Sequence, residues 1–420
     1  MYDIVIVGAG IAGASLVRKT SEYAKSLIIE ARKENNPLVA TNIFPEHNKP
    51  FLQEVDYSDS SIFPLFHEKM NYMGSTDNGV VDSTEFGAPF GHAIHTESLV
   101  KNLCQKAVDK GADIKYGEKI SNIVKHGEYI ELINNKGVSY KAKFVALATG
   151  SSGFELQHTA GFQTPDSYQG IFTHLRGDQD VLDEQMPYTY VFHINSKIST
   201  NGPFYLSKGR ERMPLGFMGN SNESPADLVD KLNRIINNYK RIQTFVKNLK
   251  QDEKPVILNI SKHPIKQFSQ DRMVVIGEAA GLVTSFFYEG LLCGVCSADI
   301  VAKTLKPLFE DDSNLTRSEL QVYDRELFRL LINKYNQNGT GSEYLFYNVG
   351  SHIKVLWDTY VKLINKDRQL KKEIWEAYRM HDIENYTLKG TKRAGKILFS
   401  MLPVLTKIAL SGKFLKAAFI

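Results

Sequence analysis

Three glycines near the N-terminus have the spacing that brings a peptide backbone close to a phosphate group. They form Gly8-x-Gly10-x-x-Gly13, directly after an apolar and β-branched run at residues 2–7. The first glycine permits a tight turn, the second lets the backbone approach a pyrophosphate, and the third lets a helix pack closely on the strand. The N-terminus of that helix then faces the phosphates. The segment therefore predicts a dinucleotide-binding βαβ unit.

A carboxylate follows at the position where such a unit binds ribose. Residues 27–30 are typical of the second strand, and Glu30 is its last residue. A carboxylate at the end of this strand accepts hydrogen bonds from an adenosine ribose. The residues that we assign to this end of the nucleotide are Gly8, Ala9, Gly10, Ile11, Ala12, Gly13, Glu30, Ala31 and Arg32.

A second glycine-rich segment lies far along the chain, at residues 273–281 (MVVIGEAAG). It combines an apolar strand, a turn, an acidic residue and small residues. A single dinucleotide-binding unit does not extend that far, so the two segments suit the two ends of a long ligand. FAD has a polyol linker and a ring beyond its pyrophosphate, and NAD has no such linker. Glu278 can bind the ribityl hydroxyls, and we therefore predict FAD as the cofactor.

Three short motifs resemble the markers of FAD proteins with the glutathione-reductase-type fold. They are the fingerprint at residues 8–13, Ala-Thr-Gly at 148–150 and Gly-Glu-Ala-Ala-Gly at 277–281. Within that superfamily, Gly281 and the Tyr-Glu-Gly at 288–290 resemble the geranylgeranyl reductase family. The related p-hydroxybenzoate hydroxylase-like flavoproteins usually have His at the position of Gly281. The resemblance covers roughly residues 1–310, and it extends the expected cofactor site to Ile120, Ala148, Gly150, Gly277, Glu278, Gly281, Gly290 and Leu291.

This resemblance implies a reductase of C=C bonds in the isoprenoid chains of lipids or prenyl precursors. Reduced flavin would give a hydride to one alkene carbon, and a proton would reach the other. A helix that begins near Gly290 would point its N–H groups at the flavin and stabilise the anionic reduced ring. By position, Tyr205 and Tyr288 are the candidate catalytic proton donors, and the alternative is that both are aromatics of the pocket wall. The electron donor is external, either NAD(P)H or a ferredoxin.

Other functions stay open at this point. One is an FAD-dependent monooxygenase that hydroxylates an aromatic or lipid substrate, and another is a flavin-binding or lipid-binding protein without turnover. Cys293 and Cys296 suit either a redox-active dithiol or a packed helix, and we favour the packed helix. The histidines show no metal-ligand spacing with cysteines or carboxylates, so we expect no metal site.

The predicted elements give an α/β fold in three parts. An FAD-binding Rossmann-like domain comprises residues 1–155 and 260–310, and an antiparallel-sheet substrate domain with a helix comprises residues 156–259. Residues 311–420 form a helical C-terminal region. We expect residues 33–92 to be irregular, because they are rich in Asn, Pro, Ser and aromatic residues.

Charge and composition limit the setting in which the protein works. The chain has 420 residues, 3 cysteines and a net charge of +4, which is ordinary for a globular protein without a disulfide framework. Residues 389–420 carry seven basic residues and no acidic one, so the rest of the chain is nearly neutral. This distribution argues against nucleic-acid binding. We expect no signal peptide and a cytoplasmic protein at the inner membrane surface, with an amphipathic tail that either contacts lipid or packs on the body as a helical pair.

Overall fold

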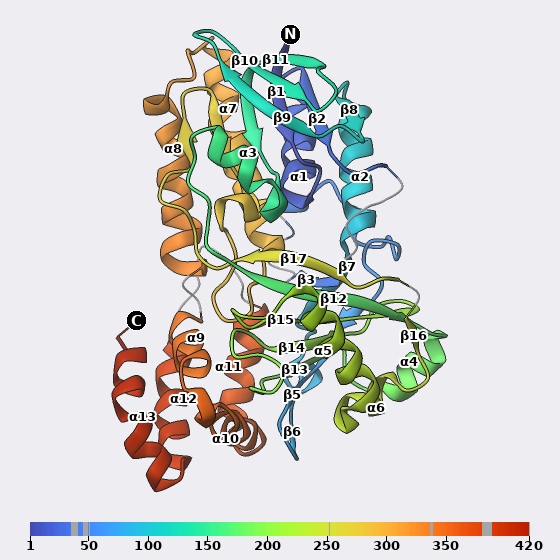
Figure 1. Cartoon of the computed structure of the whole chain (residues 1–420), viewed down its shortest axis with the longest axis vertical. Coiled ribbons are helices and arrows are strands. Elements are labelled where there is room, and N and C mark those ends of the chain that lie inside the picture. The colour runs from blue at the N-terminus through green and yellow to red at the C-terminus, as the bar shows by residue number, and fades with distance from the viewer. Residues whose placement is uncertain are drawn as a thin grey trace.

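The computed structural model describes residues 1–34, 41–44, 49, 51–251, 253–336, 339–379 and 389–419. It has a mixed α/β fold with several sheets, and Figure 1 shows two lobes. One lobe is built on a largely parallel sheet near the N-terminus. The other combines a second sheet with the C-terminal helices.

The first sheet contains the predicted βαβ unit. β1 (Tyr2–Val7) lies between β11 (Ser139–Leu147) and β2 (Ser26–Glu30) and is parallel to both. The strand order is β18 (Ser269–Gln270), β19 (Met273–Val275), β11, β1, β2 and β8 (Asp113–Tyr116), with a hairpin of β9 (Ile120–Lys125) and β10 (Ile130–Asn134) added to β11. Because β1 and β2 are buried on both faces, their sequences are continuous apolar runs.

Three helices pack against one another beside this sheet. They are α1 (Ile11–Thr20), α2 (Thr96–Val108) and α7 (Leu291–Glu310), and α1 lies between the other two in contact (Figure 1). Short segments close the strand ends nearby: η3 (Gly150–Gly153), α3 (Phe154–Thr159) and η4 (Gly277–Ala280).

The second sheet draws its strands from distant parts of the chain. Its order is β16 (Lys250–Gln251), β12 (Ser167–Arg176), β15 (Arg212–Met218), β14 (Phe204–Ser207), β13 (Tyr190–His193), β5 (Lys69–Met73) and β6 (Asn78–Asp82), and β17 (Val256–Ser261) also pairs with β12. The pairs are antiparallel except for β13 with β5, which is parallel. Helices α4 (Gln179–Gln185), α5 (Pro225–Asn238) and α6 (Lys240–Val246) accompany this sheet.

The prediction that residues 33–92 are irregular was wrong for the strands described below, and its residues 35–40, 45–48 and 50 lie outside the described residues. This segment supplies β5 and β6 to the second sheet, and β3 (Thr41–Phe44) and β4 (Phe66–His67) pair with β7 (Gly91–His95) in a small third sheet. It also includes the short helix η2 (Ser83–Phe86). The strands are short, and β5 pairs with a strand more than 100 residues away, so no local pattern indicates the pairing.

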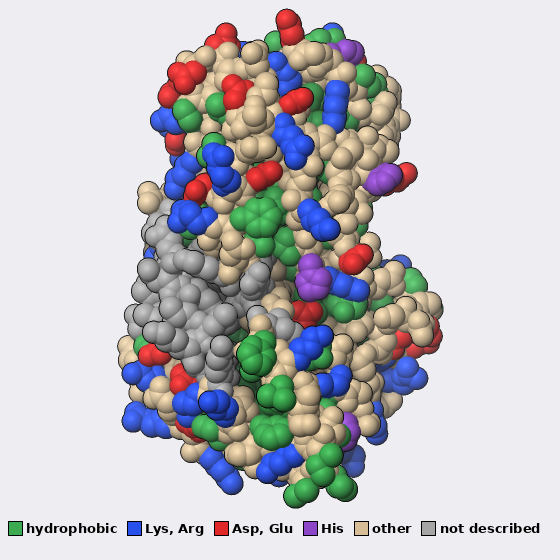
Figure 2. All heavy atoms as spheres, turned by 90° about the vertical axis from the view of Figure 1, so that its left-hand side faces the viewer, with side chains coloured by type: hydrophobic (Ala, Val, Ile, Leu, Met, Phe, Trp, Pro, Cys, Tyr) green, Lys and Arg blue, Asp and Glu red, His purple; other side chains and the backbone are tan. Residues whose placement is uncertain are grey.

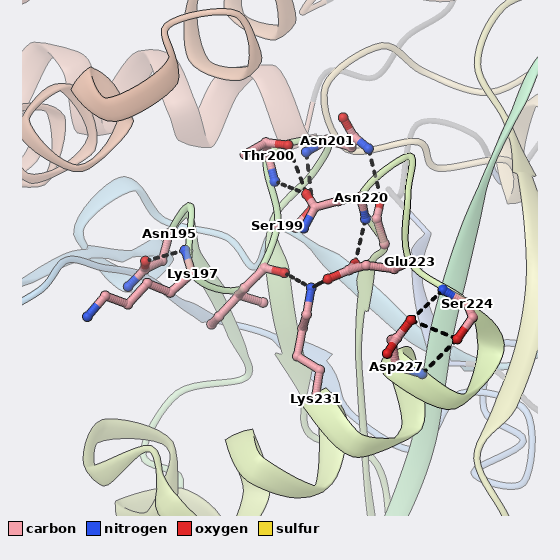
Figure 3. Close-up of polar contacts among 12 residues, drawn as sticks. Asn195, Lys197, Ser199, Thr200, Asn201, Asn220, Glu223, Ser224, Asp227 and Lys231 are labelled. Atoms are coloured by element: carbon pink, nitrogen blue, oxygen red, sulfur yellow. Dashed lines mark hydrogen bonds and ion pairs between the residues drawn. The ribbon is translucent and has the colours of Figure 1, made fainter.

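A polar network fixes helix α5 to the loops beside it (Figure 3). Ser224 and Asp227 form a capping box in which each side chain accepts the other residue's backbone N–H. Glu223 accepts a hydrogen bond from the Asn220 backbone N–H (2.7 Å) and forms an ion pair with Lys231. The Lys231 ammonium also donates to the Ile198 carbonyl (2.9 Å). These groups satisfy one another, so we assign the network to stability.

Beyond residue 315 the described chain is helical, as predicted. The elements are α8 (Arg317–Leu327), η5 (Phe328–Asn336), α9 (Thr340–Tyr347), η6 (Gly350–His352), α10 (Ile353–Lys366), α11 (Arg368–Arg379), α12 (Lys389–Met401) and α13 (Val404–Ala417). Helix α10 packs on β6, and the buried indole of Trp357 donates a hydrogen bond to the Met73 carbonyl (2.8 Å). The C-terminal helices therefore complete the core of the second lobe.

Candidate active site

Two of the three fingerprint glycines are required by close contacts of the backbone. Gly8 has a φ of +105°, and a Cβ placed there would lie 2.4 Å from the Ala148 carbonyl oxygen. A Cβ on Gly13 would lie 1.9 Å from the Gly8 carbonyl oxygen. By contrast, no atom lies within 4 Å of a Cβ built on Gly10, which immediately precedes helix α1. Gly10 therefore faces open space at a helix N-terminus, where a phosphate is favoured.

The Glu30 carboxylate forms hydrogen bonds with the glycine turn and with Arg32. One carboxylate oxygen accepts a hydrogen bond from the Ala9 backbone N–H (2.6 Å), and the other accepts from the backbone N–H and the Nε of Arg32 (2.8 and 2.9 Å). Burial by itself raises the pKa of Glu30, but the hydrogen bonds and charge of Arg32 outweigh it and hold the pKa below its usual range. The carboxylate is thus ionised at neutral pH. The end of β8 lies beside it, since the Glu118 N–H donates to the Glu30 carbonyl (3.0 Å).

The second glycine motif meets the first one in space. A Cβ on Gly277, whose φ is +61°, would lie 2.8 Å from the Ala12 Cβ. A Cβ on Gly294 in α7 would lie 3.2 Å from the Ile11 side chain and 3.4 Å from the Ala12 Cβ. Helix α1 and the β19–η4–α7 segment are therefore packed through small residues. The predicted convergence of the two motifs is confirmed.

Glu278 supplies a carboxyl group at the second motif. It is partly exposed, and one carboxyl oxygen lies 3.3 Å from the Ser261 backbone N–H, which donates to it. Burial raises the pKa of Glu278 to about 7, and no charged partner opposes this effect. Because the Glu278 carboxyl group accepts only this one hydrogen bond among the described residues, it can form further hydrogen bonds with the hydroxyl groups of a polyol.

Gly281 has a conformation and a neighbour that only glycine accepts. Its φ is +72°, and a Cβ there would lie 2.2 Å from the His263 carbonyl oxygen. A histidine at this position, as in the hydroxylase branch, would displace the backbone of the segment around residue 263.

The other predicted cofactor residues lie around these motifs. Ala148 directly follows β11 and lies against Gly8, and Gly150 opens η3, which packs beside η4. Gly290 precedes α7 and Leu291 begins it. Ile120 is buried in the first sheet at the start of β9, and Ala31 is exposed after β2. Contact of these residues with FAD stays a prediction.

Helix α7 also contains the two cysteines that suggested a dithiol. Cys293 and Cys296 are both fully buried within the hydrophobic core around the first sheet, and neither forms a disulfide. This location fits the packed-helix interpretation.

The structure does not bring Tyr205 and Tyr288 together. Tyr205 packs with the aromatic cluster of the second lobe, stacked on Tyr190 (6.3 Å between centroids), and burial raises its pKa to about 12. Tyr288 belongs to a separate small cluster, and its hydroxyl donates to the Glu343 carboxylate (2.8 Å). Burial, followed by the charge of Glu343, raises the pKa of Tyr288 far above its usual value.

A group of aromatic rings that the sequence did not indicate lies in the second lobe. We name it the aromatic box; its members are Tyr72, Tyr190, Phe192, Phe287 and Tyr378. The Phe192 ring is central, at 4.5 Å from Tyr190, 4.6 Å from Phe287, 5.6 Å from Tyr72 and 6.5 Å from Tyr378. These residues come from β5, β13, the segment before α7, and α11. No local pattern joins such distant positions.

Glu289 interacts electrostatically with this box. Burial raises the pKa of each of its three tyrosines well above the usual value, and the Glu289 carboxylate raises each of them further. Burial also raises the pKa of Glu289 itself to about 7. The sequence analysis named Glu289 only as part of the Tyr-Glu-Gly motif and gave it no role; its electrostatic neighbours depend on the fold.

The described residues lack two kinds of feature. They contain no group of three or more His, Cys, Asp or Glu side chains that could hold a metal ion. Within the same residues, no helix combines the length and the apolar character that a membrane span requires.

Known proteins resemble this chain in sequence. No family model matches it. A digeranylgeranylglycerophospholipid reductase of Methanococcus vannielii is 23% identical over 343 residues, covering 79% of this chain and 84% of that protein. The protein of the same name from Thermoplasma acidophilum is 22% identical over 356 residues, covering 82% and 87%. The resemblance to the geranylgeranyl reductase family is confirmed.

Solved structures share the fold across nearly the whole chain. A geranylgeranyl bacteriochlorophyll reductase-like protein from Thermoplasma acidophilum superposes with a TM-score of 0.69 at 15% identity, over 96% of this chain and 99% of that one. The halogenase PltM, solved in complex with phloroglucinol and FAD, superposes with a TM-score of 0.69 at 15% identity, over 99% and 96%. The fold is therefore one that reductase-like proteins and halogenases share.

Proposed function

We propose that this protein is an FAD-dependent oxidoreductase that reduces C=C bonds of isoprenoid chains in lipids or prenyl precursors. The observation that carries the proposal is the contact of Gly277 and Gly294 with Ala12, which joins the two glycine motifs into one site. The names of the curated relatives support the substrate class.

The residues present fit FAD. Gly10 leaves space at the N-terminus of α1 for the pyrophosphate, Glu30 is ionised beside the turn, and Glu278 offers a carboxyl group for the polyol. Helix α7 begins at Leu291, so its N-terminal N–H groups are available to stabilise negative charge on a reduced ring. When bound, FAD supplies the hydride for the alkene.

The second lobe supplies an environment for an apolar chain. The aromatic box presents five rings from four separate segments, and such rings bury a large apolar area at little entropic cost. We place the prenyl chain against these rings and treat residues 156–259, extended by β5 and β6, as the substrate domain. The external electron donor is NAD(P)H or a ferredoxin.

A monooxygenase is the second candidate. A p-nitrophenol 4-monooxygenase from Pseudomonas putida shares the fold, with a TM-score of 0.69 at 13% identity. The close approach of the His263 carbonyl to Gly281 speaks against it, because the histidine typical of that branch would not fit here.

Reoxidation of the reduced protein distinguishes the two functions. The protein is loaded with FAD, reduced without oxygen and mixed with a geranylgeranyl lipid. We expect the flavin absorbance to return without oxygen and the lipid to gain two hydrogens. Return of absorbance only with oxygen, together with a hydroxylated product, would support the monooxygenase instead.

We further propose that helix α13 contacts an anionic membrane surface. Four of its large apolar side chains, Val404, Leu405, Ile408 and Leu415, are between 65% and 81% exposed, and Phe419, just after the helix, is 89% exposed. Lys407, Lys413 and Lys416 lie in the same segment, which has no acidic residue. Figure 2 shows hydrophobic and basic side chains interspersed over the lower part of the face on which α13 lies. Because apolar burial and lysine attraction to anionic headgroups add, this surface suits a lipid interface.

Helices α12 and α13 form a pair, and the inner face of this pair packs on the rest of the second lobe. Leu398, Leu402 and Leu410 are buried in the core of the second lobe, and Arg393 forms ion pairs with Asp367 and Glu373. A helical pair can therefore pack on the protein and still present α13 to lipid.

Sedimentation with vesicles tests the membrane contact. We expect the protein to sediment with vesicles containing anionic phospholipid and to do so less with purely zwitterionic ones. The double variant Leu405→Asp/Ile408→Asp should lose this binding, whereas Val322→Asp, at an exposed apolar position on α8, should keep it. Equal binding of the double variant and the wild type would contradict the proposal.

A further inference from the structure

Glu289 lies where the two lobes meet. It precedes Gly290 at the start of α7, the helix whose Gly294 packs on Ile11 and Ala12 of the fingerprint. Two hydrogen bonds close the turn before it: the Thr284 N–H donates to the Glu289 carbonyl (3.0 Å), and the Glu289 N–H donates to the Thr284 hydroxyl (3.0 Å). The backbone of Glu289 is therefore fixed relative to the predicted flavin site.

The Glu289 carboxyl group lies within electrostatic range of the aromatic box. Its charge acts on Tyr72 of β5, Tyr190 of β13 and Tyr378 of α11, which are the titratable groups near it. The carboxyl group forms no hydrogen bond with any described residue, and no charged group offsets its burial. Yet the residue is partly exposed, although the three tyrosines beside it are buried.

We propose that the Glu289 carboxyl group is the proton donor of the reaction, acting on an alkene held against the aromatic box. This inference rests on the proposed function. One alkene carbon receives a hydride from reduced FAD, and the electron pair of the π bond forms a C–H bond at the other carbon with the Glu289 proton. The alkene is reduced, FAD is oxidised, and Glu289 is left as a carboxylate that regains a proton from water.

Glu289 suits this task better than the two tyrosines predicted from the sequence. The ideal pKa of a general acid lies near the working pH. Burial raises the pKa of Glu289 to about 7, whereas burial raises the pKa of Tyr205 to about 12. The Tyr288 hydroxyl is engaged with Glu343 (2.8 Å). We therefore reassign both tyrosines to the walls of the site.

Single-turnover kinetics of Glu289→Gln test the proposal. The FAD-loaded variant and the wild type are reduced without oxygen and mixed with either a geranylgeranyl lipid or oxygen. We expect the variant to be reoxidised by the lipid about 10²–10⁴-fold more slowly, the range that general acid catalysis supplies. Reoxidation by oxygen should stay within about twofold of the wild-type rate, because it does not use this proton donor.

Asp324→Asn is the matched control. Asp324 is another partly buried carboxyl group whose pKa burial raises, but it lies on α8, where it accepts a hydrogen bond from Ser269. This variant should be reoxidised by the lipid at the wild-type rate. The flavin spectrum and melting temperature of both variants verify that they fold and bind FAD.

Titration provides a readout that does not depend on turnover. Glu278 also has a pKa of about 7, so infrared difference spectra between pH 6 and pH 8 should show its signal in both proteins. The wild type should show one further carboxyl group that loses its proton near pH 7, and this signal should be absent from Glu289→Gln. Since the protonated form is the active one, the wild-type reoxidation rate should fall as the pH rises through 7, and the variant's rate should not.

The outcomes separate the two proposals. Equal reoxidation of the wild type and Glu289→Gln by the lipid overturns the role of Glu289 and leaves the proposed function standing. If the lipid reoxidises neither protein although both bind FAD, the proposed function is wrong and the role of Glu289 falls with it.

Discussion

The two lobes of this protein are built on different kinds of contact. In the first lobe the decisive contacts are close approaches of glycines: Gly8 to the Ala148 carbonyl, Gly13 to the Gly8 carbonyl and Gly277 to the Ala12 methyl group. In the second lobe they are between large side chains, as in the aromatic box and around Trp357. The difference suits the two ligands that we propose. A pyrophosphate requires close approach of N–H groups, whereas a prenyl chain requires apolar surface.

The lobes also differ in their ionisable groups. Glu30 of the first lobe is paired with Arg32 and its pKa is lowered. In and around the second sheet, His67 and His193 are buried and their pKa values are lowered, because burial disfavours their charged forms. Arg32 thus keeps Glu30 charged, whereas burial keeps these two histidines neutral.

Gly13→Ala should have the largest effect. The added Cβ would overlap the Gly8 carbonyl oxygen, from which it would lie 1.9 Å. Backbone atoms cannot move aside cheaply, so we expect a loss of about 5 kcal/mol, at the exceptional end for point variants. Denaturant unfolding measures this loss, and a variant with wild-type stability would show that the lobe does not depend on this contact.

Trp357→Ala tests the side-chain packing of the second lobe. Trp357 is 1% exposed, and truncation of a buried aromatic residue costs about 3–5 kcal/mol. Trp375→Ala is the matched control. Because Trp375 is only partly buried, we expect its truncation to lower the free energy of unfolding by less. Chemical denaturation compares the two variants, and equal losses would contradict the central position of Trp357.

Acid should destabilise the protein through the buried histidines. The pKa of His193 is lowered to about 4, chiefly by burial, while an unfolded histidine has a pKa of about 6.5. Between these values the unfolded state binds a proton that the folded state excludes, so the free energy of unfolding decreases as the pH falls from 6.5 to 4. His193→Gln should show a weaker dependence over this range. His158→Gln, at an exposed position, should behave like the wild type.

Gly10→Ala should change the stability least. A Cβ at Gly10 meets no atom within 4 Å, so the melting temperature of the protein without FAD should stay at the wild-type value. The methyl group would occupy the space proposed for the pyrophosphate, and we expect FAD affinity to fall about tenfold, equivalent to about 1.4 kcal/mol. Flavin fluorescence titration measures this affinity. Unchanged affinity would place the pyrophosphate elsewhere.

The site was predicted from the sequence unevenly. The fingerprint, Glu30 and the motif around Gly277 were found because their physical requirements are local: a glycine turn, a strand end and a helix start within a few residues. Glu289 was quoted only as the middle residue of the Tyr-Glu-Gly motif and received no role, because a carboxyl group becomes an acid with a pKa near 7 only through what surrounds it.

By itself, the sequence determined the parallel βαβ unit, the return of the chain to the first sheet at residues 273–281 and the helical character of the C-terminal region. These features follow from apolar runs, glycine spacing and helical periodicity, each of which acts over a short stretch of chain. Only the tertiary structure decided that β5 and β6 join the second sheet, that Tyr205 and Tyr288 lie in separate clusters, and that Glu289 interacts electrostatically with three tyrosines. The reason is that the pairing of distant strands and the burial of a side chain depend on contacts between residues far apart in the chain.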